Sequence, residues 1–262
     1  TAYDENGNLE YFRRNWAPFN IIDELKNNYI DVNVIDLKLQ TDISYKFTKH
    51  LRYDFVGALR YVKSTLEHQI TENSNMANAY RSMGTQVIID GNKFLYQDPD
   101  GEDPTKKISV LPYGGFYNRS EDFLTNYDFR NSVSYNNTFN DKHTIALLLG
   151  QQVKYTDRQN SNSTGYGYQY DNGGVAFPDY HILKKTIEAN FPYYGMSKTF
   201  DRFVAYYLNA QYTYDRRYNI YGTVRYDGSN KLGASKTARW LPTWSFGGSW
   251  NIDQEKFFES VR

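Results

Sequence analysis

The sequence contains no cysteine in its 262 residues. Disulfide frameworks, thiolate chemistry and cysteine-based zinc sites are therefore excluded. The sequence also has no run approaching the roughly 18 consecutive apolar residues that a membrane-spanning helix needs. A transmembrane β-barrel stays open, because each of its strands needs only about 10 alternating residues and leaves the mean hydropathy low.

Net charge is absent as well. The 30 Lys and Arg residues balance the 30 Asp and Glu residues, so no overall field draws the chain toward nucleic acid, and we expect no nucleic-acid partner. Residues 1–5 lack the basic region and apolar stretch of a signal peptide. For an exported protein, we expect such a sequence to begin downstream of the true start.

Aromatic residues are abundant instead. They make up 18% of the chain, with 26 Tyr, 16 Phe and 4 Trp, although the mean hydropathy is polar at -0.75. Aromatic side chains suit a pleated sheet, and Tyr and Trp settle at water–lipid boundaries, where both ring and polar tip are satisfied. A soluble core would draw more on Leu, Ile and Val. The composition favours a β-sheet in contact with a membrane interface.

Apolar and polar residues alternate with a period of two in seven segments, which predicts seven strands. Leu37, Leu39 and Ile43, for example, alternate with Lys38, Gln40 and Asp42. The predicted strands are residues 37–47, 51–61, 123–135, 145–155, 204–214, 218–226 and 242–252. After the last strand, Asp253 is expected to cap a short helix from Gln254 toward Ser260.

The connections between these strands alternate in length. Short turns are expected at 48–50, 136–142 and 215–217, long loops at 67–121 and 157–201, and a medium loop at 228–239. Within the first long loop, Val87–Tyr96 is expected to be extended. Short turns at one rim and long loops at the other are typical of an up-and-down antiparallel transmembrane β-barrel. Seven strands are too few to close it, so residues 1–262 are expected to be an internal part of one barrel domain.

A combined motif near the end of the chain carries a family resemblance. Thr223–Gly233 reads TVRYDGSNKLG, and it is followed by Arg239–Pro242, Trp244–Ile252 and Glu255–Phe258. This string resembles the SusC/RagA-type branch of the TonB-dependent outer-membrane transporters. Weaker matches are Tyr135–Phe139 and the turn Tyr214–Tyr218.

The resemblance implies a barrel of about 22 strands whose lumen is closed by a plug domain, which together with the remaining strands lies outside this sequence. It further implies a place in the cell outer membrane, active transport energised by TonB through the plug, and a SusD-like surface lipoprotein as partner. The transported nutrient would be an oligosaccharide or a peptide. Alternatives from other classes are a passive porin, an outer-membrane enzyme barrel and a soluble β-sandwich that binds glycans.

Two sets of aromatic residues are candidate sites. Tyr166, Tyr168 and Tyr170 alternate with glycines in the second long loop, where they are candidate ligand contacts, with packing between loops as the alternative. Trp240, Trp244 and Trp250, with Tyr212, Tyr214 and Tyr218 near the short-turn rim, are candidate interfacial aromatics of a girdle in the bilayer interface.

Catalytic and cofactor sites have little support in the sequence. His50, His68, His143 and His181 lack metal-ligand spacing. The acidic segment 98–103 lacks the spacing of a twelve-residue calcium loop, so a solvated loop tip is the favoured interpretation. No Gly-x-Ser-x-Gly nucleophile pattern occurs. We therefore expect no catalytic residue, cofactor or metal, and a protein that is not an enzyme.

Overall fold

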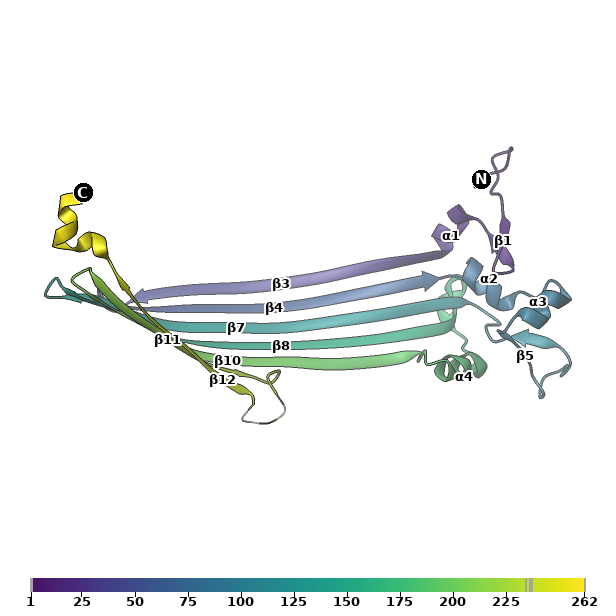
Figure 1. The fold of residues 1–262 in the computed structure, drawn as a ribbon. Helices are drawn as coiled ribbons and strands as arrows, with labels where there is room; N and C mark the ends of the chain where they lie inside the picture. Colours follow the sequence, from purple (N-terminus) through teal and green to yellow (C-terminus); the bar gives the residue numbers. More distant parts are fainter. Residues whose placement is uncertain (1, 234, 236–237, 262) are drawn as a thin grey trace. The chain divides into compact units, whose positions relative to one another are not determined.

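One large antiparallel sheet dominates the computed structural model, which describes residues 2–233, 235 and 238–261. The strand order is β12-β11-β10-β8-β7-β4-β3, so each long strand pairs with the next long strand along the chain (Figure 1). The strands are β3 Asn28–Lys46, β4 Leu51–Ile70, β7 Gly115–Phe139, β8 His143–Gln169, β10 Tyr194–Tyr214, β11 Tyr218–Ser229 and β12 Trp240–Trp250. The seven predicted strands and their up-and-down order are confirmed, and the described sheet is open.

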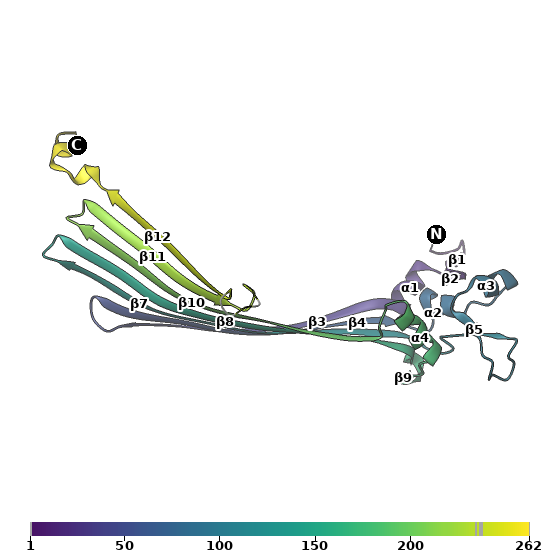
Figure 2. The ribbon, with the colours of Figure 1, turned by 60° about the horizontal axis from the view of Figure 1, so that its bottom comes forward.

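The chain divides into two compact units. Unit 1 comprises Thr1–Val34, Lys63–Asp122 and Gln159–Ser197, and unit 2 comprises Ile35–Val62, Phe123–Arg158 and Lys198–Arg262. Unit 2 holds nearly all of the residues in which the sequence alternates, together with the three short turns (Figure 2). Unit 1 holds the long connections.

Left-handed backbone closes two of the short turns in unit 2. Asn140 and Asp141 have φ of 49° and 55°, and Asp215 and Arg216 have φ of 50° and 58°. Two consecutive left-handed residues form the type I′ turn, whose twist matches that of the flanking strands. The N–H of Lys142 closes the first turn on the carbonyl of Phe139 at 3.1 Å.

The register of β10, β11 and β12 separates an apolar face from a polar one. Val204, Gly228 and Trp240 stand opposite one another, and the next rows on the same face are Tyr206–Tyr226–Pro242, Leu208–Val224–Trp244, Ala210–Gly222–Phe246, Tyr212–Ile220–Gly248 and Tyr214–Tyr218–Trp250. The rows between them lie on the other face and include Asn209–Thr223–Ser245 and Thr213–Asn219–Ser249. Successive side chains point to opposite faces of a strand, so the sequence alternation becomes a two-faced sheet.

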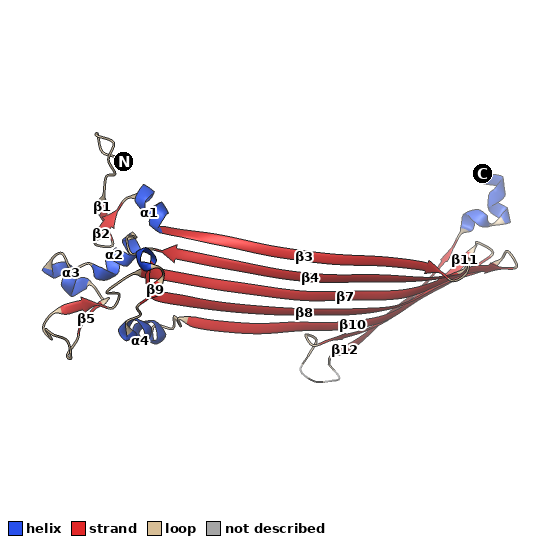
Figure 3. Ribbon diagram, turned by 180° about the vertical axis from the view of Figure 1, so that it is seen from behind, coloured by secondary structure: helices blue, strands red, loops and turns tan. Residues whose placement is uncertain are grey.

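Unit 1 surrounds the strand ends with short elements, and its helices gather there (Figure 3). These elements are β1 Phe12–Arg14, β2 Ala17–Phe19, α1 Ile21–Asn27, α2 Asn75–Arg81, α3 Gln86–Gly91, β5 Leu95–Gln97, β6 Lys107–Ser109, η1 Tyr170–Asn172, β9 Val175–Ala176 and α4 Tyr180–Glu188. Their hydrophobic core consists of Ile70, Ala77, Val110, Leu111, Phe116, Tyr166 and Ile182. The long connections therefore form a packed unit.

The two long loops were predicted to be longer than they are, and no helices were predicted within them. The strands continue through Ile70 and Gln169, which leaves connections of residues 71–114 and 170–193. The extended segment predicted at Val87–Tyr96 was wrong over its first half, which forms α3. Each helix of unit 1 begins after a polar cap: Asn20, Ser74, Thr85 and Asp179 accept hydrogen bonds from the first-turn N–H groups of α1 to α4.

The C-terminal segment forms two short 3-10 helices, η2 Ile252–Gln254 and η3 Lys256–Val261, in place of the predicted helix capped by Asp253. Glu255 separates them because its backbone is extended, and its carboxylate accepts hydrogen bonds from three side chains. No helix in the described part of the chain is long and apolar enough to cross a bilayer.

Candidate functional site

The candidate ligand contacts lie at the end of a strand. Tyr166 and Tyr168 belong to β8 and Tyr170 to η1, so the predicted loop position was wrong. The Tyr166 ring is only 8% exposed and packs edge-on against Phe116, with 5.9 Å between ring centroids. Tyr166 is therefore part of the core of unit 1.

Tyr168 and Tyr170 are half-buried and lie beside other rings. Tyr168 stacks on Tyr117 with centroids 5.2 Å apart and meets Tyr170 edge-on at 4.8 Å. The Tyr170 hydroxyl donates to the Phe116 carbonyl at 2.7 Å, and burial raises the pKa of this hydroxyl. Tyr168 and Tyr117 thus form a stacked pair beside the core, and ligand contact by these residues stays a prediction.

Gly167, between Tyr166 and Tyr168, and Gly114, which lies against it, are both required by the backbone. Gly114 and Gly167 have φ of 67° and 68°, which favours glycine. A Cβ on Gly114 would lie 2.5 Å from the backbone of Gly167, and one on Gly167 would lie 2.2 Å from the carbonyl oxygen of Phe177. Gly114 and Gly167 therefore permit three backbone segments to cross closely.

A charged cluster on β4 and β7 was missed by sequence reasoning. Arg119 bridges Glu67 and Glu121 at 3.1 and 2.8 Å, and Lys63 lies 3.6 Å from Glu121. The hydrogen bond from Arg119 lowers the pKa of Glu121, and the Tyr117 hydroxyl donates to Glu67. Two cations balance two carboxylates, so the cluster ties β4 to β7 and leaves no net charge for a ligand. The available signal was the even spacing, four residues from Lys63 to Glu67 on β4 and two from Arg119 to Glu121 on β7, which places each pair on one face of its strand.

Four of the six candidate interfacial aromatics lie at the short-turn end of the strands. At the short-turn end, Tyr218 stacks between Tyr214 and Trp250, with centroids 6.5 and 6.3 Å apart. Tyr212 lies in the same area and stacks on His143 at 6.0 Å. The register places these residues in the last two rows of the apolar face.

The other two tryptophans lie away from that rim. Trp240 begins β12 and stacks on Tyr226 at 4.8 Å, whereas Trp244 stands between the two ends and is 79% exposed. Ten residues separate Trp240 from Trp250, which corresponds to about 33 Å along a strand. The aromatics therefore form two groups with Trp244 between them, and their place in a bilayer interface stays a prediction.

The histidines make separate hydrogen bonds. His50 and His143 pair with the Asn136 carbonyl and the Tyr212 hydroxyl at 2.8 and 2.6 Å. His68 pairs with the Asn28 amide oxygen at 2.7 Å, and His181 with Asp179 at 2.7 Å. Over residues 2–233, 235 and 238–261, no three histidine, aspartate or glutamate side chains gather as a metal site requires.

The acidic segment 98–103 forms a turn. The N–H of Asp100 donates to the Asp98 carboxylate at 3.1 Å, and the N–H of Gly101 donates to the Asp98 carbonyl at 3.2 Å. Asp103 accepts from both the N–H and the hydroxyl of Thr105, at 3.0 and 2.6 Å. Two of the carboxylates thus accept hydrogen bonds from neighbouring residues. The solvated loop tip stays a prediction.

Comparison with known proteins adds to this geometry. No protein-family model matches the chain. TonB-dependent receptor P39 of Formosa agariphila is 30% identical over 238 residues, which cover 84% of this chain and 22% of that protein. The solved structure of the RagAB peptide transporter matches with a TM-score of 0.62 at 13% identity, over 98% of this chain and 24% of that chain. The RagAB peptide importer in its open-open state matches with a TM-score of 0.63.

The chain spans less than a quarter of the length of these relatives. The structural matches, at 13% identity, concern the fold, and they cover nearly the whole chain. The sequence similarity to TonB-dependent receptor P39 is a second likeness, independent of the structural matches. The open antiparallel sheet has the fold of part of a transporter barrel, and the resemblance of the chain to the SusC/RagA-type TonB-dependent outer-membrane transporters is confirmed.

Proposed function

We propose that the whole protein takes up a nutrient, an oligosaccharide or a peptide, through a plugged barrel in the cell outer membrane, energised by TonB. Residues 1–262 are part of its barrel domain, and the plug and remaining strands belong to the rest of the protein. The observation that carries the proposal is the two-faced register of β10, β11 and β12, because a water-filled or plugged barrel needs lipid on one face and a polar interior on the other.

Exposure of the apolar face supports a barrel over a soluble sandwich. Val224, Trp244 and Phe246 are 54%, 79% and 73% exposed in the chain by itself. In a β-sandwich such rows would be covered by a second sheet about 10 Å away. In a barrel they contact hydrocarbon.

The two groups of aromatics support the same orientation. A strand segment of about 33 Å, tilted by about 40°, rises about 25 Å along the membrane normal, which is the height of the apolar band of outer-membrane barrels. We infer that Tyr214, Tyr218 and Trp250 lie at one bilayer interface and Tyr226 and Trp240 at the other. Trp244 then contacts the hydrocarbon between them.

Unit 1 contains the long connections, which in barrels of this kind lie on the extracellular side. We propose that unit 1 faces the SusD-like surface lipoprotein and the incoming substrate. Tyr168 and Tyr170, half-buried beside Tyr117, are the candidate contacts there. The relatives are named as a receptor and a peptide transporter, which favours transport over an enzymatic role.

Uptake by intact cells tests this proposal. Cells that produce or lack the whole protein would be given fluorescent oligosaccharides and peptides, with and without functional TonB. We expect uptake that requires both the protein and TonB. Protein-dependent uptake without TonB would indicate a passive porin, hydrolysis of the substrate at the surface would indicate an enzyme barrel, and recovery of the protein without detergent would indicate a soluble fold.

A further inference from the structure

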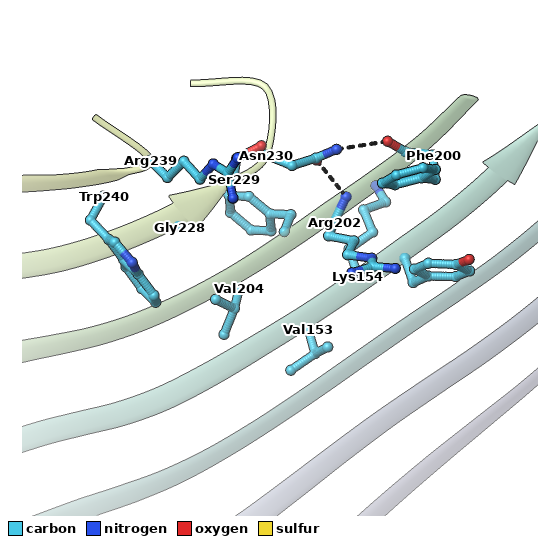
Figure 4. A pocket seen from close by; sticks show the side chains of 12 residues that line it. Val153, Lys154, Phe200, Arg202, Val204, Gly228, Ser229, Asn230, Arg239 and Trp240 are labelled. Carbon is cyan, nitrogen blue, oxygen red and sulfur yellow. Dashed lines mark hydrogen bonds between the residues drawn. The ribbon is translucent and has the colours of Figure 1, made fainter. Parts of the chain in front are cut away.

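A hollow of about 770 Å³ opens on unit 2 where β10 passes beside β8 and β11 (Figure 4). Val153, Val204 and Trp240 supply apolar side chains to it. Val204, Gly228 and Trp240 form one row of the sheet register, on the apolar face described above. The hollow therefore lies on the face that contacts lipid.

The shape of the hollow is built into the backbone. Gly228 leaves room for the Trp240 ring, since a Cβ at Gly228 would lie 2.7 Å from that ring. The Asn230 side chain bridges two groups of β10: its oxygen accepts from the Arg202 N–H and its nitrogen donates to the Phe200 carbonyl, both at 2.8 Å. The segment beside the hollow is thus fixed to the strand (Figure 4).

Arg202 places a positive charge in the hollow. Its guanidinium lies 5.0 Å from the centroid of the Phe200 ring and 5.9 Å from that of Tyr155. None of the ion pairs found among the described residues involves Arg202, whereas Lys154, which also lines the hollow, lies 3.7 Å from Asp128. Two aromatic rings hold the Arg202 guanidinium in place without neutralising its charge.

The acidic residues nearby are already paired. Asp157 lies 3.2 Å from Lys198, and Asp201 lies 2.7 Å from Arg158 and 2.8 Å from Lys231. The lining residues include the basic residues Arg202, Lys154 and Arg239 and no acidic residue, and Arg202 shares a face of β10 with Val204. An anionic group would therefore find a complementary charge there.

We propose that this hollow binds a phosphate-bearing lipid of the leaflet on the side of the long connections. The apolar side chains suit acyl chains, and the planar fork of an arginine matches two phosphate oxygens. The row of Val204 and Trp240 is also the last apolar-face row that β10, β11 and β12 share, and Arg202 lies one step beyond it on β10, where the proposed orientation places lipid headgroups. This inference rests on the proposed membrane location and does not depend on transport.

Lipid binding to the whole protein in detergent tests the inference. Phosphatidic acid and diacylglycerol, which share acyl chains and differ in the phosphate, would be added separately, and bound lipid counted by native mass spectrometry. We expect Arg202→Gln to weaken phosphatidic acid binding about tenfold, because a hydrogen-bonded charge contributes about 1.5 kcal/mol. Val204→Trp, which fills the hollow without changing charge, should weaken both lipids.

Arg60→Gln is the matched control, because Arg60 is an exposed arginine of unit 2 that pairs with Asp36 at 2.6 Å. Arg202→Lys should restore part of the binding. Equal losses for Arg60→Gln and Arg202→Gln, or equal binding of the two lipids to the unaltered protein, would overturn the site. Displacement of the lipid by inorganic phosphate alone would show a free-anion site and overturn the lipid assignment. Lipid binding by a whole protein that supports no TonB-dependent uptake would contradict only the transport proposal.

Discussion

Tyr218 and Trp250 stand directly opposite each other on β11 and β12 and donate to the same carboxylate oxygen. The Tyr218 hydroxyl lies 2.8 Å and the Trp250 indole nitrogen 3.1 Å from Oε1 of Glu255. Arg217 donates to the other oxygen, Oε2, at 3.0 Å. Glu255 thereby joins the β10–β11 turn to the end of β12.

This carboxylate should make the barrel fragment sensitive to acid. Its hydrogen bond from Tyr218 lowers the pKa of Glu255 below the usual 4.5. Its stabilising contribution is therefore complete above pH 4.5 and is lost as pH falls through the lowered pKa. Glu255→Gln should lower the thermal midpoint of the whole protein at neutral pH, and the difference should shrink as the pH falls through the lowered pKa of Glu255. Heat-modifiable gel mobility measures that midpoint.

Glu188→Gln is the control, since Glu188 is exposed at the end of α4 and only loosely paired, at 3.9 Å from Lys184. Exposed ion pairs of this kind contribute little to the free energy of unfolding. A midpoint that falls equally for both variants would contradict the role of Glu255.

Arg216 occupies a left-handed position with φ of 58° in the β10–β11 turn. A side chain with a Cβ is strained there by about 1–2 kcal/mol, whereas glycine is not, although glycine loses more entropy on folding. Arg216→Gly should therefore stabilise the protein by about 0.5–1 kcal/mol. Denaturant unfolding in micelles would measure this change. Lys49 lies in the β3–β4 turn and has no positive φ, so Lys49→Gly should not stabilise the protein. A gain in stability of the same size for Lys49→Gly would contradict the explanation by backbone strain at Arg216.

Neighbouring residues on β11 distinguish the two faces of the sheet. Val224 belongs to an apolar row and Thr223 to a polar one. Arg at a lipid-facing position near the middle of the bilayer costs about 2–4 kcal/mol, whereas the interior of a barrel accepts it. Val224→Arg should reduce assembly of the folded protein in the membrane and Thr223→Arg should leave it nearly intact, measured by heat-modifiable mobility. The reverse order would invert the assigned faces.

Alternation predicted the strands of unit 2 because apolar and polar residues occupy opposite faces of each strand. It missed the outer part of β8, where Gln159–Ser163 are polar on both faces while the backbone still pairs with its neighbours. The caps Ser74, Thr85 and Asp179 were readable, but α2 and α3 are too short to show a helical period.

The candidate sites divide in a similar way. The interfacial aromatics were predicted as one set, and the spacing of ten positions from Trp240 to Trp250 was the signal that separates them to the two ends of β12. The contacts of Glu255 could not be predicted from the sequence, because they depend on the turn that brings Arg217 close to Glu255. The cation beside the hollow depends on Asn230 fixing a loop to β10, which is a tertiary contact with no sequence pattern.

Two tyrosines of β8 should respond differently to truncation. Tyr166 is buried against Phe116, so Tyr166→Ala should destabilise unit 1 by about 3–5 kcal/mol, as for other large aromatic side chains replaced in a core. Limited proteolysis of the long connections would detect this loss, and Tyr113→Ala, at a position 60% exposed, provides the control.

Tyr168→Ala tests the ligand-contact prediction because Tyr168 is half-buried and stacks on Tyr117 outside the core cluster. If Tyr168 binds substrate, its loss should weaken substrate affinity of the whole protein by about fivefold to tenfold, since a stacked ring contributes about 1 kcal/mol, while resistance to proteolysis stays near that of the unaltered protein. Lower resistance with unchanged affinity would assign Tyr168 to packing alone.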